Sequence, residues 1–135
     1  MNTNNAPSLN NLLYPQESYV LVGLFYKVHN ELGRYRNEKQ YCDRFEQLLI
    51  DNKILYKREY CLPPSFIGEK KIRNRVDFLV FDKIIIDFKA KLFVDKDDYF
   101  QMQRYLQSAK LRLGYIVNFH KKYLTPKRIV NIIMR

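Results

Sequence analysis

Hydrophobic and polar residues alternate along residues 75–89, RVDFLVFDKIIIDFK. This pattern is typical of β-strands, whose successive side chains point to opposite faces of a sheet. We predict a hairpin with a loop at residues 81–83, because residues that pair across it then share a face. One face is wholly apolar and holds Val76, Phe78, Val80, Ile84, Ile86 and Phe88. On the other face Asp77 lies opposite Asp87, and Lys89 lies beside them.

Two helices are predicted before this hairpin. Ser18 is expected to cap the first helix, which ends at Gly33 because glycine commonly follows a helix. Asn37 is expected to cap the second helix, which runs to about Asn52. Gln40 stands three residues after Asn37 and completes the pattern of a capping box.

Three further strands and a third helix complete the predicted elements. The further strands are expected over residues 54–66, 112–119 and 128–134, and the first strand of the hairpin is expected over residues 71–81. Pro63 and Pro64 interrupt the first of them, which favours a position at the edge of a sheet. Asp95 is expected to cap a helix that runs to about Lys110. The order helix, helix, strand, strand, strand, helix, strand, strand favours an α/β fold with a mixed central β-sheet flanked by helices.

The size and charge of the chain suggest one basic domain. Its 135 residues suffice for a single core, and we expect a flexible N-terminal tail over residues 1–14 and one domain over residues 15–135. The net charge of +10 indicates a polyanionic partner, and nucleic acid is the expected one, with DNA favoured over RNA. The candidate phosphate contacts lie in the run KKIRNR and are Lys70, Lys71, Arg73 and Arg75. The alternative interpretation of this run is a solvated edge of the sheet.

Several other function classes are not indicated. The longest apolar run, YVLVGLFYKV from Tyr19, is too short to span a bilayer, so no membrane partner is expected. The first residues, MNTNNAPSLNN, lack the basic start and apolar core of a secretory signal. Cys42 and Cys61 form no CxxC pair and no zinc pattern. We therefore expect a cytoplasmic protein with free thiols.

The charged residues of the hairpin indicate a metal site. Asp77, Asp87 and Lys89 would meet on a strongly apolar scaffold, where unpartnered charges are costly. Carboxylate oxygens are the ligands that Mg²⁺ prefers. Glu38 stands three residues before Tyr41 on the second helix and is expected to face the edge of the core. Two alternatives remain: Lys89 and Asp87 form an ordinary cross-strand ion pair, and Glu38 only complements its helix dipole.

The spacing of Asp77, Asp87 and Lys89 on a hairpin resembles the signature of the PD-(D/E)xK nuclease superfamily. Within that superfamily the chain resembles the small GxxExxY family. The matching segments, in order, are VHNELG at 28–33, Glu38 with Tyr41, RVDFLV at 75–80, DFKA at 87–90, QMQRYL at 101–106 and GYIVNF at 114–119. Tyr35 takes the place of the glycine in the family motif, and Asp87 stands where Glu is more usual.

The resemblance implies a restriction-endonuclease-like core and a metal-dependent nuclease that hydrolyses phosphodiester bonds with Mg²⁺ or Mn²⁺. The implied metal ligands are Asp77, Asp87 and the backbone carbonyl of Phe88. Glu38 would hold a metal-bound water or a second ion. This set forms the metal part of the implied site.

Three further residues take implied roles near the metal. Lys89 would orient or activate the attacking water. Gln101 matches the QxxxYL pattern of the family and is counted with the catalytic residues. Tyr105 follows one helical turn later on the same face and would contact nucleic acid.

A second function is kept open beside the nuclease. A catalytically inactive module with the nuclease fold would bind nucleic acid or a protein partner, and the tyrosine at position 35 motivates this alternative. A chain this small could also form a homodimer to cut two strands.

Overall fold

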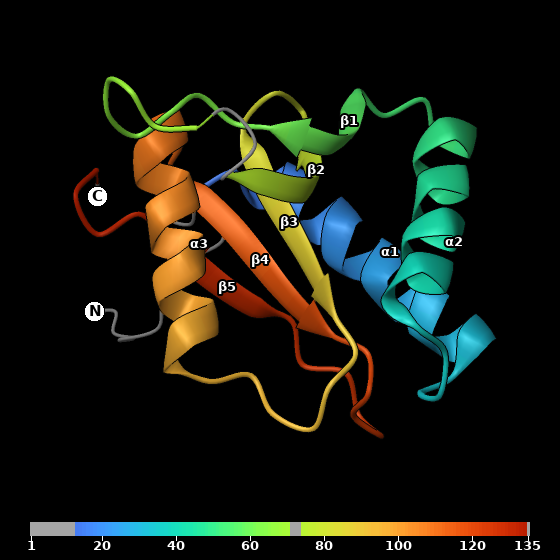
Figure 1. Ribbon diagram of the computed structural model, residues 1–135. Helices are drawn as coiled ribbons and strands as arrows, with labels where there is room; N and C mark the ends of the chain where they lie inside the picture. Colours follow the sequence, from blue (N-terminus) through green and yellow to red (C-terminus); the bar gives the residue numbers. More distant parts are fainter. Residues whose placement is uncertain (1–12, 71–73, 135) are drawn as a thin grey trace, which may run out of the picture.

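The computed structural model describes residues 13–70 and 74–134 (Figure 1). Residues 1–12 of the expected tail lie outside the described residues. Two of the candidate phosphate contacts, Lys71 and Arg73, also lie outside them.

The eight expected elements occur in the expected order. They are α1 (Pro15–Leu32), α2 (Glu38–Asp51), β1 (Tyr56–Cys61), β2 (Arg75–Val80), β3 (Ile84–Lys89), α3 (Lys96–Ala109), β4 (Leu113–Asn118) and β5 (Lys127–Val130). No helix in the described part of the chain is long and apolar enough to cross a bilayer.

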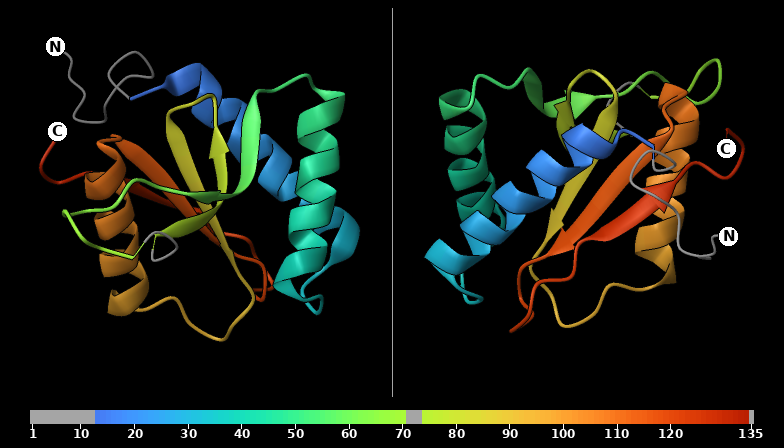
Figure 2. Two further views of the ribbon diagram at one scale, coloured as in Figure 1. Left: turned by 45° about the horizontal axis from the view of Figure 1, so that its top comes forward. Right: turned by 180° about the vertical axis from the view of Figure 1, so that it is seen from behind.

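The strands form one mixed sheet in the order β1-β2-β3-β4-β5. Neighbouring strands are antiparallel except β3 and β4, which are parallel because α3 carries the chain back between them. The helices α1 and α2 lie on one face of the sheet and α3 lies on the other (Figures 1 and 2). The prediction of a mixed α/β sheet flanked by helices is therefore confirmed.

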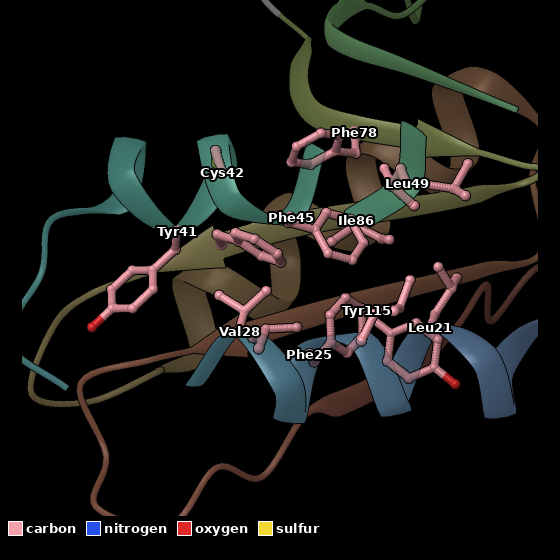
Figure 3. Packing of buried hydrophobic residues seen from close by; sticks show 14 of the residues in the cluster. Leu21, Phe25, Val28, Tyr41, Cys42, Phe45, Leu49, Phe78, Ile86 and Tyr115 are labelled. Carbon is pink, nitrogen blue, oxygen red and sulfur yellow. The ribbon is translucent and has the colours of Figure 1, made fainter. Parts of the chain in front are cut away.

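The main hydrophobic core lies between the sheet and the pair α1 and α2 (Figure 3). Phe88 from β3 is at its centre, and its ring meets those of Phe25, Phe45, Phe78 and Phe119 at centroid distances of 4.7 to 5.9 Å. A smaller cluster that includes Ile85, Ile116, Met102 and Leu106 lies under α3. Five of the six residues on the predicted apolar face of the hairpin thus belong to the main core, and the opposite face of the sheet packs against α3 and carries polar residues.

The helix ends follow their sequence signals with one correction. Asn37 and Gln40 form the predicted capping box of α2, and α1 ends at Leu32 with Gly33 at a φ of 77°. The prediction that Ser18 caps α1 is wrong, because α1 begins three residues earlier at Pro15. Proline suits this first helical position, where its missing N–H would have no helical partner.

The ends of two outer strands also differ from the prediction. The strand expected over residues 54–66 ends at Cys61, before the two prolines, which cannot donate to a ladder. The last strand ends at Val130 rather than at residue 134. There Asn131 turns the chain, since its side-chain Oδ1 accepts the backbone N–H of Ile133.

Val76 does not share the face that alternation predicted for it. It packs in the smaller cluster under α3, whereas Phe78 packs in the main core. The β1–β2 ladder pairs Arg58 with Phe78 and Tyr60 with Val76, but Glu59 between them has a φ of 51°. The left-handed backbone of Glu59 interrupts the regular alternation of side chains. Next to this point the side chains of Val76 and Phe78 lie on opposite faces of the sheet.

Candidate active site

The candidate site lies where the β2–β3 hairpin opens. Backbone pairing runs from Val80 opposite Ile84 to Phe78 opposite Ile86, which is the register that the sequence predicts. At the next position the side chain of Asp77 accepts the backbone N–H of Phe88 at 2.7 Å. The carboxylate thus replaces a strand carbonyl and holds the two arms together where β2 begins to diverge.

Asp77 and Asp87 lie close together in this fork, so that the charge of one acts on the other. Asp87 is only 8% exposed and Asp77 is half-buried. Burial, the negative charge of Asp87 and their mutual hydrogen bond raise the pKa of Asp77 to about 7, although the N–H of Phe88 acts in the opposite direction. Two buried carboxylates this close require a proton or a cation between them. Asp77 therefore keeps its proton to a higher pH than an ordinary aspartate does.

Lys89 lies beside the acid pair and is held by three oxygen atoms. Its Nζ is 2.8 Å from Oδ2 of Asp87, 3.3 Å from Oε1 of Gln101 and 3.8 Å from Oδ1 of Asp98. Burial would lower the pKa of Lys89, but the charges of Asp87, Asp98 and Glu38 together outweigh it and raise the pKa. Lys89 is thus a fixed, fully charged ammonium group.

The first turn of α3 positions this lysine from above the sheet. Asp95 accepts the backbone N–H groups of Asp97 and Asp98, and Asp98 accepts the N–H of Asp95 in return. Asp98 also pairs with Lys91 at 2.5 Å, and these contacts outweigh its burial and lower its pKa. Its role near Lys89 is absent from the sequence analysis. The Asp95-x-x-Asp98 spacing is the signal that could have indicated a capping role.

The side chain of Glu38 is more exposed to solvent than the sequence predicts. Its side chain is exposed rather than directed at the edge of the core, because it stands at the very first position of α2. It lines a cleft of about 180 Å³ together with Cys42, Arg58 and Asp77. Its negative charge is close enough to raise the pKa values of both Asp77 and Lys89. The structure therefore brings Glu38 near the carboxyl pair but not into contact with it.

The oxygen donors of the site meet the needs of a magnesium ion. Among the described residues no three His, Cys, Asp or Glu side chains form a ready ligand cluster. Mg²⁺ is commonly held by only one or two carboxylates and keeps several waters. The proton-sharing pair of Asp77 and Asp87 supplies that number of oxygen donors, so the residues present fit this ion.

The described residues of the expected nucleic-acid surface fall into two groups. Lys70 and Arg75 are exposed near the start of β2. Tyr105 belongs to α3, is only 7% exposed and packs in the cluster between that helix and the sheet, where burial and the charge of Asp87 raise its pKa. Tyr105 is therefore buried against the sheet rather than placed on an open surface.

The arrangement can perform a limited range of chemistry. It offers two acidic oxygen donors for a hard cation, one fixed ammonium group and one amide, all at the rim of a sheet. A phosphate group carries the negative charge that suits both the cation and Lys89.

Comparison with known proteins agrees with this geometry. The family model described as PD-(D/E)XK nuclease superfamily matches residues 15–130, which includes every described element from α1 to β5. No curated protein and no solved structure matches the chain.

Proposed function

Because this chain belongs to the PD-(D/E)XK nuclease superfamily, we propose that it is a metal-dependent nuclease that hydrolyses phosphodiester bonds of nucleic acid. The single observation that carries the proposal is the charged cluster at the open end of the hairpin, where Asp77 accepts the N–H of Phe88 at 2.7 Å and Nζ of Lys89 lies 2.8 Å from Oδ2 of Asp87. If Lys89 and Asp87 formed only a structural ion pair, one carboxylate would be enough to balance the lysine, and Asp77 would not be needed. The second buried carboxylate raises the free energy of the metal-free protein and calls for a cation.

Asp77 and Asp87 would hold Mg²⁺ or Mn²⁺, with the backbone carbonyl of Phe88 as a further ligand. Glu38 would hold a water of the ion or a second ion across the cleft that it shares with Asp77. When bound, the ion supplies Lewis-acid stabilisation of the negative charge that develops on the phosphate. The N–H of Phe88 keeps Asp77 in place for this role.

Lys89 would act on the attacking water and on the phosphate. Its Nζ is charged, so it donates hydrogen bonds and orients the water rather than removing a proton from it. Gln101 is a positioning residue, because its Oε1 accepts from Nζ of Lys89 and restricts where the ammonium can move. Asp98 supports the same position from the start of α3.

The nucleic-acid contacts are proposed on charge. A net charge of +10 favours a phosphate backbone. The proposed contacts are Lys70, Lys71, Arg73 and Arg75, with DNA preferred to RNA as the substrate. The burial of Tyr105 argues against the contact expected for it. We further propose that the protein is cytoplasmic and forms a homodimer.

Membership of the GxxExxY family is also a proposal. The spacing of Glu38 and Tyr41 supports it, and the tyrosine has a clear local role. Its hydroxyl donates to the carbonyl of Gly33 at 2.6 Å and accepts the N–H of Arg36 at 3.1 Å, and its ring stacks on Phe119 at 4.2 Å. Tyr41 thus anchors the turn that leads into Glu38.

The test is a cleavage assay with purified protein and Mg²⁺ or Mn²⁺. Plasmid, single-stranded DNA and RNA are incubated with the wild type and with Asp87→Ala. We expect metal-dependent cleavage of at least one substrate by the wild type and none by the variant. The proposal fails if no substrate is cut, or if the variant cuts as fast as the wild type.

The exposed position of Glu38 favours one alternative, a module of the same fold that binds nucleic acid without cutting it. In that case the two carboxylates would keep their shared proton and take no ion. Titration calorimetry separates the two functions. Absence of Mg²⁺ and Mn²⁺ binding, together with salt-sensitive affinity for oligonucleotides, would favour the alternative.

A further inference from the structure

A basic cleft with two exposed aromatic rings lies next to the candidate active site. It has a volume of about 290 Å³, and its lining includes Phe93, Val94, Asn118, Lys121, Tyr123 and Lys127. None of the residues that line it is acidic. We define it as the Phe93–Tyr123 cleft, and neither ring belongs to the site described above.

The aromatic rings of this cleft face solvent. Phe93 is 71% exposed and Tyr123 is 76% exposed. Lys121 places its Nζ 4.9 Å from the ring centroid of Phe93, and Lys122 places its Nζ 5.4 Å from that of Tyr123. Each ring is thus accompanied by a cation, a combination that suits a ligand with both a flat π-face and negative charge.

The sheet topology joins this cleft to Lys89. Strands β3 and β4 are parallel and pair Lys89 with Asn118, so their following loops leave the sheet at one edge (Figure 1). The side chain of Asn118 accepts the N–H of Lys91 at 3.1 Å and donates to its carbonyl at 2.8 Å. Asn118 therefore fixes the loop that carries Phe93 to the strand beside the site.

The cleft begins one strand away from Lys89. Strands β3 and β4 are neighbours that pair Lys89 with Asn118, and neighbouring strands lie about 4.8 Å apart. Asn118 also lines the cleft. A nucleic-acid strand with a phosphate at the candidate active site would therefore pass close to the cleft.

We propose that the Phe93–Tyr123 cleft binds an unpaired nucleobase of the substrate strand by stacking, while its lysines contact the adjacent phosphates. The bases of a duplex stack on one another and hide their faces, so this cleft selects single strands or unpaired ends. The inference rests on the proposed nuclease function and specifies its substrate class.

The test measures binding by fluorescence anisotropy in the presence of EDTA, so that no substrate is cut. The probes are a labelled single-stranded oligonucleotide, a strand of the same length made of abasic residues, and a duplex. The test variant combines Phe93→Ala with Tyr123→Ala. The matched control combines Tyr19→Ala with Tyr26→Ala, which removes two exposed rings from α1 on the opposite side of the sheet.

The aromatic variant is expected to bind the base-containing single strand about tenfold or more weakly than the wild type, because each stacked base contributes about 1 to 3 kcal/mol. Its affinity for the abasic strand and for the duplex should be unchanged, and the control variant should match the wild type throughout. Tyr123→Phe, which keeps the ring, should retain wild-type binding.

Two results would overturn the inference. One is wild-type affinity of the aromatic variant for the base-containing strand, and the other is an equal loss for the abasic strand. A parallel cleavage assay separates the two proposals. Unchanged binding by the variant with active cleavage by the wild type refutes only the stacking cleft. Base-dependent binding without cleavage refutes only the nuclease, and absence of both binding and cleavage refutes both.

Discussion

Asp77→Asn is expected to stabilise the metal-free protein at alkaline pH. In the wild type the pair of Asp77 and Asp87 holds a proton with a pKa of about 7, against an ordinary value of 3.8. The folded protein therefore binds a proton that the unfolded chain releases between these values. Its stabilising effect is complete below about pH 4 and is lost as the pH rises through 7. Asparagine has no such proton to lose and can still accept the N–H of Phe88.

The magnitude follows from the two pKa values of Asp77. Their difference of about 3 corresponds to roughly 4 kcal/mol at 1.36 kcal/mol for each pKa unit. Asp77 is half-buried, so water screens part of the repulsion from Asp87. We therefore expect the variant to gain about 2 to 4 kcal/mol over the wild type above pH 8, and nearly nothing at pH 4.

The assay is urea unfolding with EDTA at a series of pH values. Asp82→Asn is the matched control, since Asp82 is exposed in the loop of the same hairpin at a φ of 57°, which asparagine tolerates. Saturating Mg²⁺ should remove the advantage of Asp77→Asn, because the ion stabilises only the wild-type pair. A stability difference between Asp77→Asn and the wild type that does not change with pH would refute the shared proton.

Three further substitutions test parts of the site and the fold. Lys89→Ala should abolish cleavage but leave Mn²⁺ affinity largely intact by titration calorimetry, and loss of metal binding would contradict its role. Asp98→Asn should lower the free energy of unfolding by about 1 kcal/mol, because it weakens the contact with the N–H of Asp95 at the start of α3 and the ion pair with Lys91. It should also reduce kcat more than KM. An unchanged kcat would argue against a role for Asp98 in positioning Lys89. Gly114→Ala should lower the free energy of unfolding in urea by about 1 to 3 kcal/mol, since the new Cβ would lie 2.5 Å from Sδ of Met102. In a Met102→Ala background the same Gly114→Ala substitution should cost less, because the clashing side chain is gone.

The parts of the molecule that local patterns determine were predictable. The period-2 pattern and the loop length set the register of β2 and β3, and that register brings Asp77 to the open end of the hairpin, where it accepts the N–H of Phe88 next to Asp87. The capping box of Asn37 and Gln40 placed the start of α2 in the same way. In each case the signal lies within a few residues of the structure it determines.

Features that depend on distant segments were not predictable. The turn of Val76 to the other face depends on the left-handed conformation of Glu59 in the neighbouring strand. The contact of Asp98 with Lys89 depends on where α3 begins above the sheet. The Phe93–Tyr123 cleft joins two loops that come together only because β3 and β4 are parallel neighbours.

The central claim is that Asp77 and Asp87 together form a divalent-cation site. The most direct test is a crystal soaked with Mn²⁺ and measured for anomalous scattering. We predict an anomalous peak between the two carboxylates, displacement of their shared proton and retention of Lys89 beside Asp87. A fully soaked crystal with both carboxylates still hydrogen-bonded to each other and no peak between them would contradict the claim.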